Sequence, residues 1–137
     1  MTSNIGNIAA KNVEHRKHQR LPIAISASIA IDDSVKYKGT TKNISFNGAY
    51  VHCDQATMPD LGTNCIITLT LQDGPEPVTI KFKARVKHFK DTNIGLEFQA
   101  IFAEDYNDFV YLMVNNSPDP DALLEEISRN PGIKIHT

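Results

Sequence analysis

With 137 residues, the chain is long enough for one domain with a single hydrophobic core and short terminal segments. Its 41% hydrophobic and 22% charged residues exclude a disordered or fibrous protein, and a formal net charge of -2 argues against a general nucleic-acid binder. The sequence contains neither a run of roughly 18 apolar residues, as a membrane-spanning helix needs, nor a secretory signal. We therefore expect a cytoplasmic protein without membrane insertion, in which Cys53 and Cys65 are reduced thiols.

Most of the chain shows the period-2 pattern of β-strands. Residues 1–13 have no clear period and are predicted to be a flexible tail. Alternation of apolar and polar residues predicts strands at 23–31 and 35–45. Asn47-Gly48 predicts a type I′ hairpin turn after them, in which both central residues have positive φ.

The second half of the β region continues this pattern. Strands are predicted at 49–53, 65–72, 78–89 and 93–101, separated by loops rich in Gly, Pro and Asp. In the third of them, alternate residues are expected to face inward: Val78, Ile80, Phe82, Ala84 and Val86. Short strands with no helix between them predict a mainly β fold, an antiparallel barrel or sandwich.

The C-terminal part changes to a helical period. Residues 104–126 carry only acidic charges, in contrast to the basic segment at residues 11–20. A first helix is predicted from an apolar stripe at helical spacing, formed by Tyr106, Phe109, Val110 and Met113. A second short helix is predicted after Ser117 or Asp119, either of which can cap its first turn.

No pattern in the sequence indicates an enzyme. The chain lacks G-x-S-x-G, H-E-x-x-H and a P-loop, and its five histidines do not show the spacing of metal ligands. We therefore expect no catalytic residue, no metal and no cofactor.

Two polar patterns are candidates for ligand binding. Arg16 and Arg20 in "RKHQR" offer planar guanidinium groups that bind phosphate oxygens and stack on flat bases, although such pairs are also common in solvated linkers. Asn43 and Ser45 share one face of a strand, where an amide and a hydroxyl can bind the edge of a purine. Gly48 follows them and permits a ligand to approach the backbone. A polar strand face that ends in a hairpin would explain this second pattern equally well.

Together the two patterns resemble the signature of the PilZ domain family. In that signature R-x-x-x-R is followed along the chain by D/N-x-S-x-x-G, which "RKHQR" and "NISFNG" match, and "IGLEF" resembles the closing strand of the family. The resemblance covers residues 14–115, which we expect to form the domain. Residues 116–137 resemble the short helical C-terminal extension of some single-domain members.

The resemblance implies a six-stranded antiparallel β-barrel, with C-terminal helices, that binds the bacterial second messenger cyclic di-GMP. By this resemblance, Arg16 and Arg20 would grip phosphates and stack on guanine, Asn43 and Ser45 would read a guanine edge, and Gly48 would keep the turn tight.

His15 and Lys17 flank this predicted site. The family position of His15 influences whether one ligand or a stacked ligand dimer binds, and this stays open. Binding is expected to order the basic segment and to signal to an unidentified downstream protein in motility, attachment or biofilm control. Without ligand, the acidic C-terminal region is expected to attract the basic segment.

Three other functions are possible for such a chain. A PilZ-type adaptor that binds proteins but no nucleotide is the main alternative. A small β-barrel that binds nucleic acid is disfavoured by the net charge and by the lack of a cluster of exposed aromatic residues. An enzyme has no positive feature in the sequence.

Overall fold

The computed structural model describes residues 18–32, 36–54, 59–72 and 74–136, and every structural statement below refers to these ranges. The predicted tail at residues 1–13 lies outside them. The elements in chain order are β1 (Ser26–Ala30), β2 (Lys36–Ser45), β3 (Gly48–His52), β4 (Asn64–Leu71), β5 (Val78–Lys90), β6 (Asn93–Phe102), the short 3-10 helix η1 (Ala103–Asp105), α2 (Tyr106–Asn116), α3 (Pro120–Arg129) and β7 (Lys134–His136).

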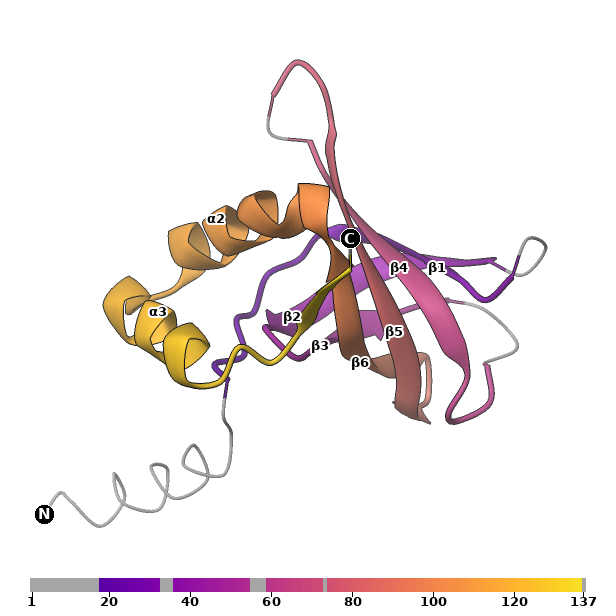
Figure 1. Ribbon diagram of the computed structural model, residues 1–137. Coiled ribbons are helices and arrows are strands. Elements are labelled where there is room, and N and C mark those ends of the chain that lie inside the picture. The colour runs from indigo at the N-terminus through magenta and orange to yellow at the C-terminus, as the bar shows by residue number, and fades with distance from the viewer. Residues whose placement is uncertain (1–17, 33–35, 55–58, 73, 137) are drawn as a thin grey trace, which may run out of the picture.

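Six of these strands close into a barrel (Figure 1). Their hydrogen-bonded order is β3, β2, β1, β4, β5 and β6, and β6 pairs again with β3. Each of these pairings is antiparallel. Closure pairs the strand edges with one another, which removes the exposed edges that an open sheet has to protect. The predicted six-stranded antiparallel barrel is confirmed.

The strand β7 continues the barrel along one edge of β6. The first part of β6 pairs with β3, and its last residues, Ala100 to Phe102, pair in parallel with β7. Between them, the N–H of Phe98 donates to the carbonyl oxygen of Asn47 at 2.9 Å. The turn between β2 and β3 therefore lies beside β6, between β3 and β7. The sequence does not predict β7, because three residues are too few to show a period.

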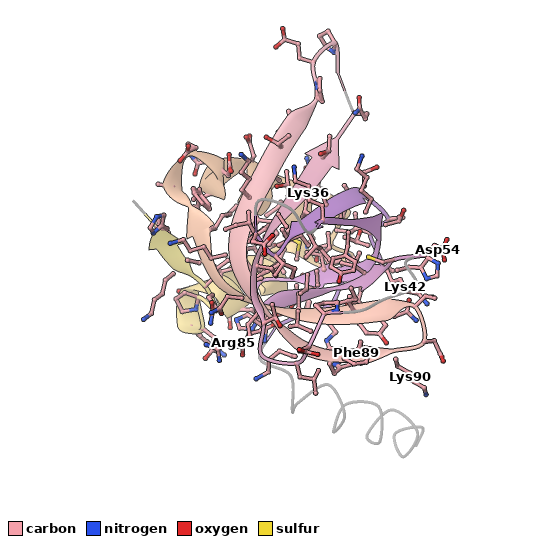
Figure 2. The ribbon with its side chains drawn as sticks, turned by 90° about the vertical axis from the view of Figure 1, so that its right-hand side faces the viewer. Lys36, Lys42, Asp54, Arg85, Phe89 and Lys90 are labelled. Carbon is pink, nitrogen blue, oxygen red and sulfur yellow. The ribbon has the colours of Figure 1, made fainter. Side chains whose placement is uncertain are left out.

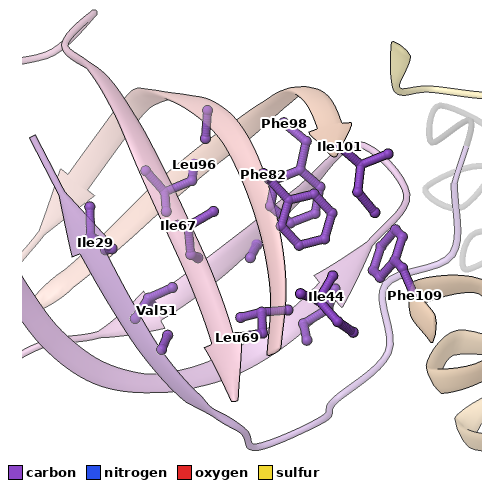
Figure 3. Close-up of a cluster of buried hydrophobic side chains, with 14 of the residues drawn as sticks. Ile29, Ile44, Val51, Ile67, Leu69, Phe82, Leu96, Phe98, Ile101 and Phe109 are labelled. Carbon is purple, nitrogen blue, oxygen red and sulfur yellow. The ribbon is translucent and has the colours of Figure 1, made fainter. Parts of the chain in front are cut away.

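The barrel interior is filled by side chains that alternate along the strands (Figure 3). The rings of Phe82 in β5 and Phe98 in β6 stack with their centroids 3.9 Å apart, and Phe109 of α2 meets Phe82 edge-on at 4.8 Å. Phe109 and Met113 of α2 are fully buried, so this helix packs on the aromatic part of the core. The other two members of the predicted helical stripe are partly buried, namely Tyr106 and Val110.

The second helix, α3, begins after Asp119, one of the two capping residues that the sequence allows. Asp119 is its N-cap, and its carboxylate accepts a hydrogen bond from the N–H of Ala122 at 3.1 Å. Pro120 occupies the first turn, where its missing N–H leaves no bond unmade. No helix within the described ranges is long and apolar enough to cross a membrane.

Two predicted strand features differ from the structure. The first strand begins at Ser26 rather than at residue 23, because residues 21–25 run alongside β2 with only scattered hydrogen bonds. Val78, predicted to face inward, is 41% exposed. It lies at the start of β5, where the β4–β5 hairpin projects beyond the barrel (Figure 1). Its side chain therefore has no barrel interior to pack into.

The hairpin between β2 and β3 turns one residue earlier than predicted. Ser45 pairs with Gly48, so the two turn residues are Phe46 and Asn47. Neither Asn47 nor Gly48 has positive φ, and the type I′ prediction is wrong. Phe46 is fully buried with its ring 5.0 Å from that of Phe109, so packing in the core draws this residue into the turn.

Exposed charges of both signs lie on the barrel, where Asp54 is exposed as well as several lysines. Lys36, Lys42 and Lys90 are exposed on the outside of the barrel (Figure 2), whereas the exposed charges of η1 and α2 are acidic. Phe89 is exposed beside Lys90 at the end of β5, after a bulge that shifts the register of this strand (Figure 2). The basic segment of the predicted charge asymmetry, residues 11–20, lies largely outside the described residues, so the asymmetry stays a prediction.

Candidate functional site

A hollow on the barrel surface collects polar side chains from strands β2, β3, β5 and β6 and from the chain before β1. Its volume is about 190 Å³, below the roughly 300–1,000 Å³ of pockets that enclose a small molecule. It is large enough to enclose one flat ring system, and the rest of a larger ligand would lie outside it. Its lining residues are Arg20, Asn43, Ser45, Asn47, Gly48, Ala49, Tyr50, Lys87, His88, Gly95, Leu96 and Glu97.

The register of the strands explains why these residues meet. Asn43 of β2 lies opposite Tyr50 of β3, Tyr50 opposite Gly95 of β6, and Gly95 opposite His88 of β5. Residues in direct cross-strand register share one face of a sheet, so the four form a row across the hollow. A second row runs parallel to it through Ser45, Gly48 and Glu97.

A β-bulge in β2 sets this register. The pairing of β2 with β3 shifts between Thr41 and Asn43, so Lys42 is an extra residue on the β2 side and points into solvent. Bulges reorient the side chains that follow them and are frequent beside functional sites. In this strand the bulge brings Asn43 to the hollow while Ile44 remains in the core.

Ser45 also lines the hollow, but its hydroxyl is engaged in the turn. The side chain is only 3% exposed, and its Oγ–H donates to Oδ1 of Asn47 at 2.5 Å. The same Oγ accepts a hydrogen bond from the N–H of Asn47 at 3.2 Å. A hydroxyl has one hydrogen and two lone pairs, so Ser45 retains one lone pair for a ligand. Its main contact in this structure stabilises the turn.

Gly48 does not have the positive φ predicted for the turn, but it lies where β3 and β6 come close together. A Cβ at this position would lie 2.3 Å from the carbonyl oxygen of Leu96 in β6. The glycine therefore permits the close approach of β3 and β6 that closes the barrel.

Tyr50 and His88 contribute two aromatic rings to the lining of the hollow. Their ring centroids are 5.3 Å apart with an interplanar angle of 35°, and the imidazole lies over Gly95, where a Cβ would be 2.7 Å from its Cε1. Aromatic faces of this kind suit stacking of a planar ligand. Sequence reasoning missed both residues, because only the register brings them beside Asn43.

Arg20 reaches the hollow because the residue after it is fixed. Leu21 is buried, and it exchanges two backbone hydrogen bonds of 2.8 and 2.9 Å with Ile44. This places Arg20 beside the part of β2 that carries Asn43 and Ser45. The other predicted residues of the basic segment lie outside the described residues, namely His15, Arg16 and Lys17.

Charged groups around the hollow are available to a ligand. No hydrogen bond or ion pair joins the side chains of Arg20, Lys87 or Glu97 to another described residue. Two cations and one carboxylate therefore border the ring-sized hollow. Within the described ranges no cluster of three His, Cys, Asp or Glu residues is arranged to hold a metal ion.

Comparison with known proteins identifies the family of the chain. Residues 14–114 match the family described as PilZ domain. No curated protein matches the chain.

Among solved structures, the inhibitor of motility from Bacillus subtilis is 20% identical with a TM-score of 0.55, and the match covers 85% of this chain but only 51% of that protein. The PilZ domain of CeSA from a cellulose-synthesizing bacterium is 22% identical with a TM-score of 0.48, over 59% of this chain and 80% of that one. An uncharacterized Legionella protein is 21% identical with a TM-score of 0.44, over 76% of this chain and 98% of that one. The family match extends over most of the chain, and this chain belongs to the PilZ domain family.

Proposed function

We propose that this protein is a receptor for cyclic di-GMP that passes the signal to another protein. The observation that supports the proposal is the meeting of the two halves of the family signature at one hollow. Arg20 belongs to "RKHQR" and Asn43 to "NISFNG", and the pairing of Leu21 with Ile44 brings them together.

The chemistry of the hollow suits one guanine base and its phosphate. Arg20 provides a guanidinium that binds phosphate oxygens in bidentate geometry and stacks on a base. The amide of Asn43 can both donate to and accept from a guanine edge, while Tyr50 and His88 offer aromatic rings for stacking. Because the hollow encloses about one ring system, we expect the basic segment that contains Arg16 to contact the rest of the dinucleotide.

Only the family resemblance supports a role for the receptor in a particular signalling pathway. Motility, attachment and biofilm control are each consistent with it, and the receptor would act on an unidentified partner protein. The alternative function is a PilZ-type adaptor without nucleotide binding. One observation favours this alternative, namely that the Ser45 hydroxyl is already bonded to Asn47 within the turn.

Calorimetric titration of cyclic di-GMP distinguishes these functions. We expect the parent protein to bind, and Arg16→Ala and Arg20→Ala to bind about tenfold to a hundredfold more weakly, the range for lost hydrogen bonds to a charged group. Arg129→Ala is the matched control, because Arg129 lies on α3 and its guanidinium pairs with Glu125. Absence of binding by the parent would support the adaptor.

Comparing the affinities for two cyclic dinucleotides tests whether the site recognises the guanine base. Cyclic di-AMP carries the same phosphates but presents an amino group where guanine presents O6. We expect it to bind clearly more weakly than cyclic di-GMP, and Asn43→Ala to reduce this preference. Equal affinity for both dinucleotides would mean that the hollow binds phosphate without reading the base.

A further inference from the structure

The chain between the two signature arginines is held by the C-terminal part of the protein. His18 Nε2 lies 2.5 Å from the carbonyl oxygen of Asn130, and since a carbonyl only accepts, the imidazole donates. The N–H of Gln19 donates to Oε1 of Glu126 at 2.7 Å. The hydroxyl of Ser117 donates to Oε1 of Gln19 at 3.1 Å. These three bonds link residues about a hundred positions apart in the sequence.

Packing around His18 tightens this contact. The imidazole is 6% exposed, and a Cβ on Gly132 would lie 2.8 Å from its Nε2 and 3.0 Å from the carbonyl oxygen of Phe46. Gly132 has a φ of +79°, which favours glycine, so both its conformation and its surroundings exclude a side chain. The chain between α3 and β7 thus lies directly over His18 and over the β2–β3 turn.

The C-terminal segment is itself fixed to the barrel. Leu123 of α3 and Ile133 before β7 are buried in the core, and β7 pairs with β6. β6 also supplies Gly95 and Glu97 to the hollow. We define the clasp as Ser117, Glu126, Asn130 and Gly132. It connects the basic segment to the same strand that forms one side of the site (Figure 1).

The groups that the clasp holds are not the groups that would bind a ligand. Glu126 accepts from the backbone N–H of Gln19 rather than from a basic side chain, and Arg20 lines the hollow while these bonds are made. A ligand therefore does not need to break the clasp in order to reach Arg20. The attraction expected between the charged side chains of the basic and acidic segments stays a prediction, because Lys11, Arg16 and Lys17 lie outside the described residues.

We propose that the clasp is a positioning element of the cyclic di-GMP site. This inference rests on the proposed function. His18 and Gln19 directly precede Arg20 in the sequence, so holding them limits where Arg20 can reach. Ordering part of the binding segment in advance lowers the entropic cost of closing it on a ligand, which strengthens binding. By thermodynamic reciprocity, ligand binding stabilises α3 and transmits occupancy of the site to the C-terminal surface.

Three variants at neighbouring positions of α3 separate hydrogen bonding from charge. Glu126→Ala removes the acceptor, Glu126→Gln keeps an acceptor oxygen without the charge, and Glu125→Ala removes a charge that pairs only with Arg129 among the described residues. We expect the first to bind cyclic di-GMP about threefold to tenfold more weakly, as for the loss of one hydrogen bond, and the other two to bind like the parent. Ser117→Ala, which removes the bond to the Gln19 side chain, should weaken binding in the same direction.

Hydrogen exchange without ligand provides a second readout. Glu126→Ala should speed exchange of the backbone amides at residues 18–21, with no such change in Glu125→Ala and with equal thermal unfolding temperatures of the two variants. Parent-like or tighter binding by both Glu126→Ala and Ser117→Ala would overturn the positioning role, and tighter binding would indicate an inhibitory clasp instead. If the parent protein binds no cyclic di-GMP, the proposed function is wrong and the positioning role fails with it. If the parent binds and the variants bind equally well, only the positioning role is wrong.

Discussion

The imidazole of His88 lies over the backbone of Gly95, and a Cβ at residue 95 would come within 2.7 Å of it. The two residues are direct neighbours in the pairing of β5 with β6. Because Gly95 of β6 has no side chain, the ring of His88 on β5 can lie over it. In this position the His88 ring contacts Tyr50.

This relationship predicts the effect of Gly95→Ala. The methyl group would displace an exposed side chain rather than backbone, so the fold should persist with a small change in unfolding temperature. The displaced ring would leave Tyr50, and we expect cyclic di-GMP to bind several-fold more weakly, since stacking of a base on an aromatic side chain contributes about 1–3 kcal/mol. Calorimetry measures the affinity.

The double variant Gly95→Ala/His88→Ala should lose little more affinity for cyclic di-GMP than His88→Ala alone, because both changes remove the same stacking surface. Fully additive losses would contradict this role for Gly95.

A second glycine predicts a loss of stability instead. An added Cβ at Gly48 would meet the carbonyl oxygen of Leu96 at 2.3 Å, and backbone cannot move away as a flexible side chain can. We expect Gly48→Ala to destabilise the protein by about 1–3 kcal/mol or more, measured by urea unfolding. Gly74→Ala is the matched control, because its Cβ would meet no atom within 4 Å. Equal stability of the two variants would show that β3 and β6 can separate at little cost.

The elements of the fold were predictable because they depend on local patterns. Period-2 alternation identified the strands, and the spacing of Phe109 and Met113 identified the helix that packs on the core. Asp119 signalled the start of α3 through the chemistry of helix capping. Each of these signals involves residues a few positions apart, which is the range over which a sequence specifies structure on its own.

The details of the site depend on long-range pairing and were not predictable in the same way. The Asn-Gly signal failed because burial of Phe46 against Phe109 shifted the turn by one residue. Tyr50 and His88 lie beside Asn43 only through the register of four strands, and that register contains bulges in β2 and β5. Asn43 and Arg20 were predicted from motif spacing, and the hollow brings them together, while their role in binding a ligand stays a prediction.

The aromatic cluster at the contact of α2 with the barrel predicts a large effect of truncation. Phe109 is fully buried and contacts the rings of Phe46, Phe82 and Phe98. Phe109→Ala should cost about 3–5 kcal/mol through lost burial and the cavity left behind, measured by urea unfolding. Tyr111→Ala on the same helix is the control, because that side chain is 71% exposed and should change stability by less than about 0.5 kcal/mol. A small effect of Phe109→Ala would mean that α2 is not a structural part of the core.

The buried thiol of Cys65 predicts how stability depends on pH. Burial raises the pKa of this thiol from 9.0 to about 11. Between these two values the thiol ionises in the unfolded chain but stays protonated in the folded protein, so the folded state binds more protons and stability falls as pH rises. Below about pH 8 the thiol is neutral in both states and does not make stability depend on pH.

Tyr and Lys side chains titrate in the same pH range, so the measurement is a comparison of the parent with Cys65→Ala by urea unfolding under reducing conditions. We expect the free energy of unfolding of the parent to fall more steeply than that of Cys65→Ala between pH 9 and about 11. Parallel curves for the two proteins would show that the thiolate is accommodated in the folded barrel as easily as in water.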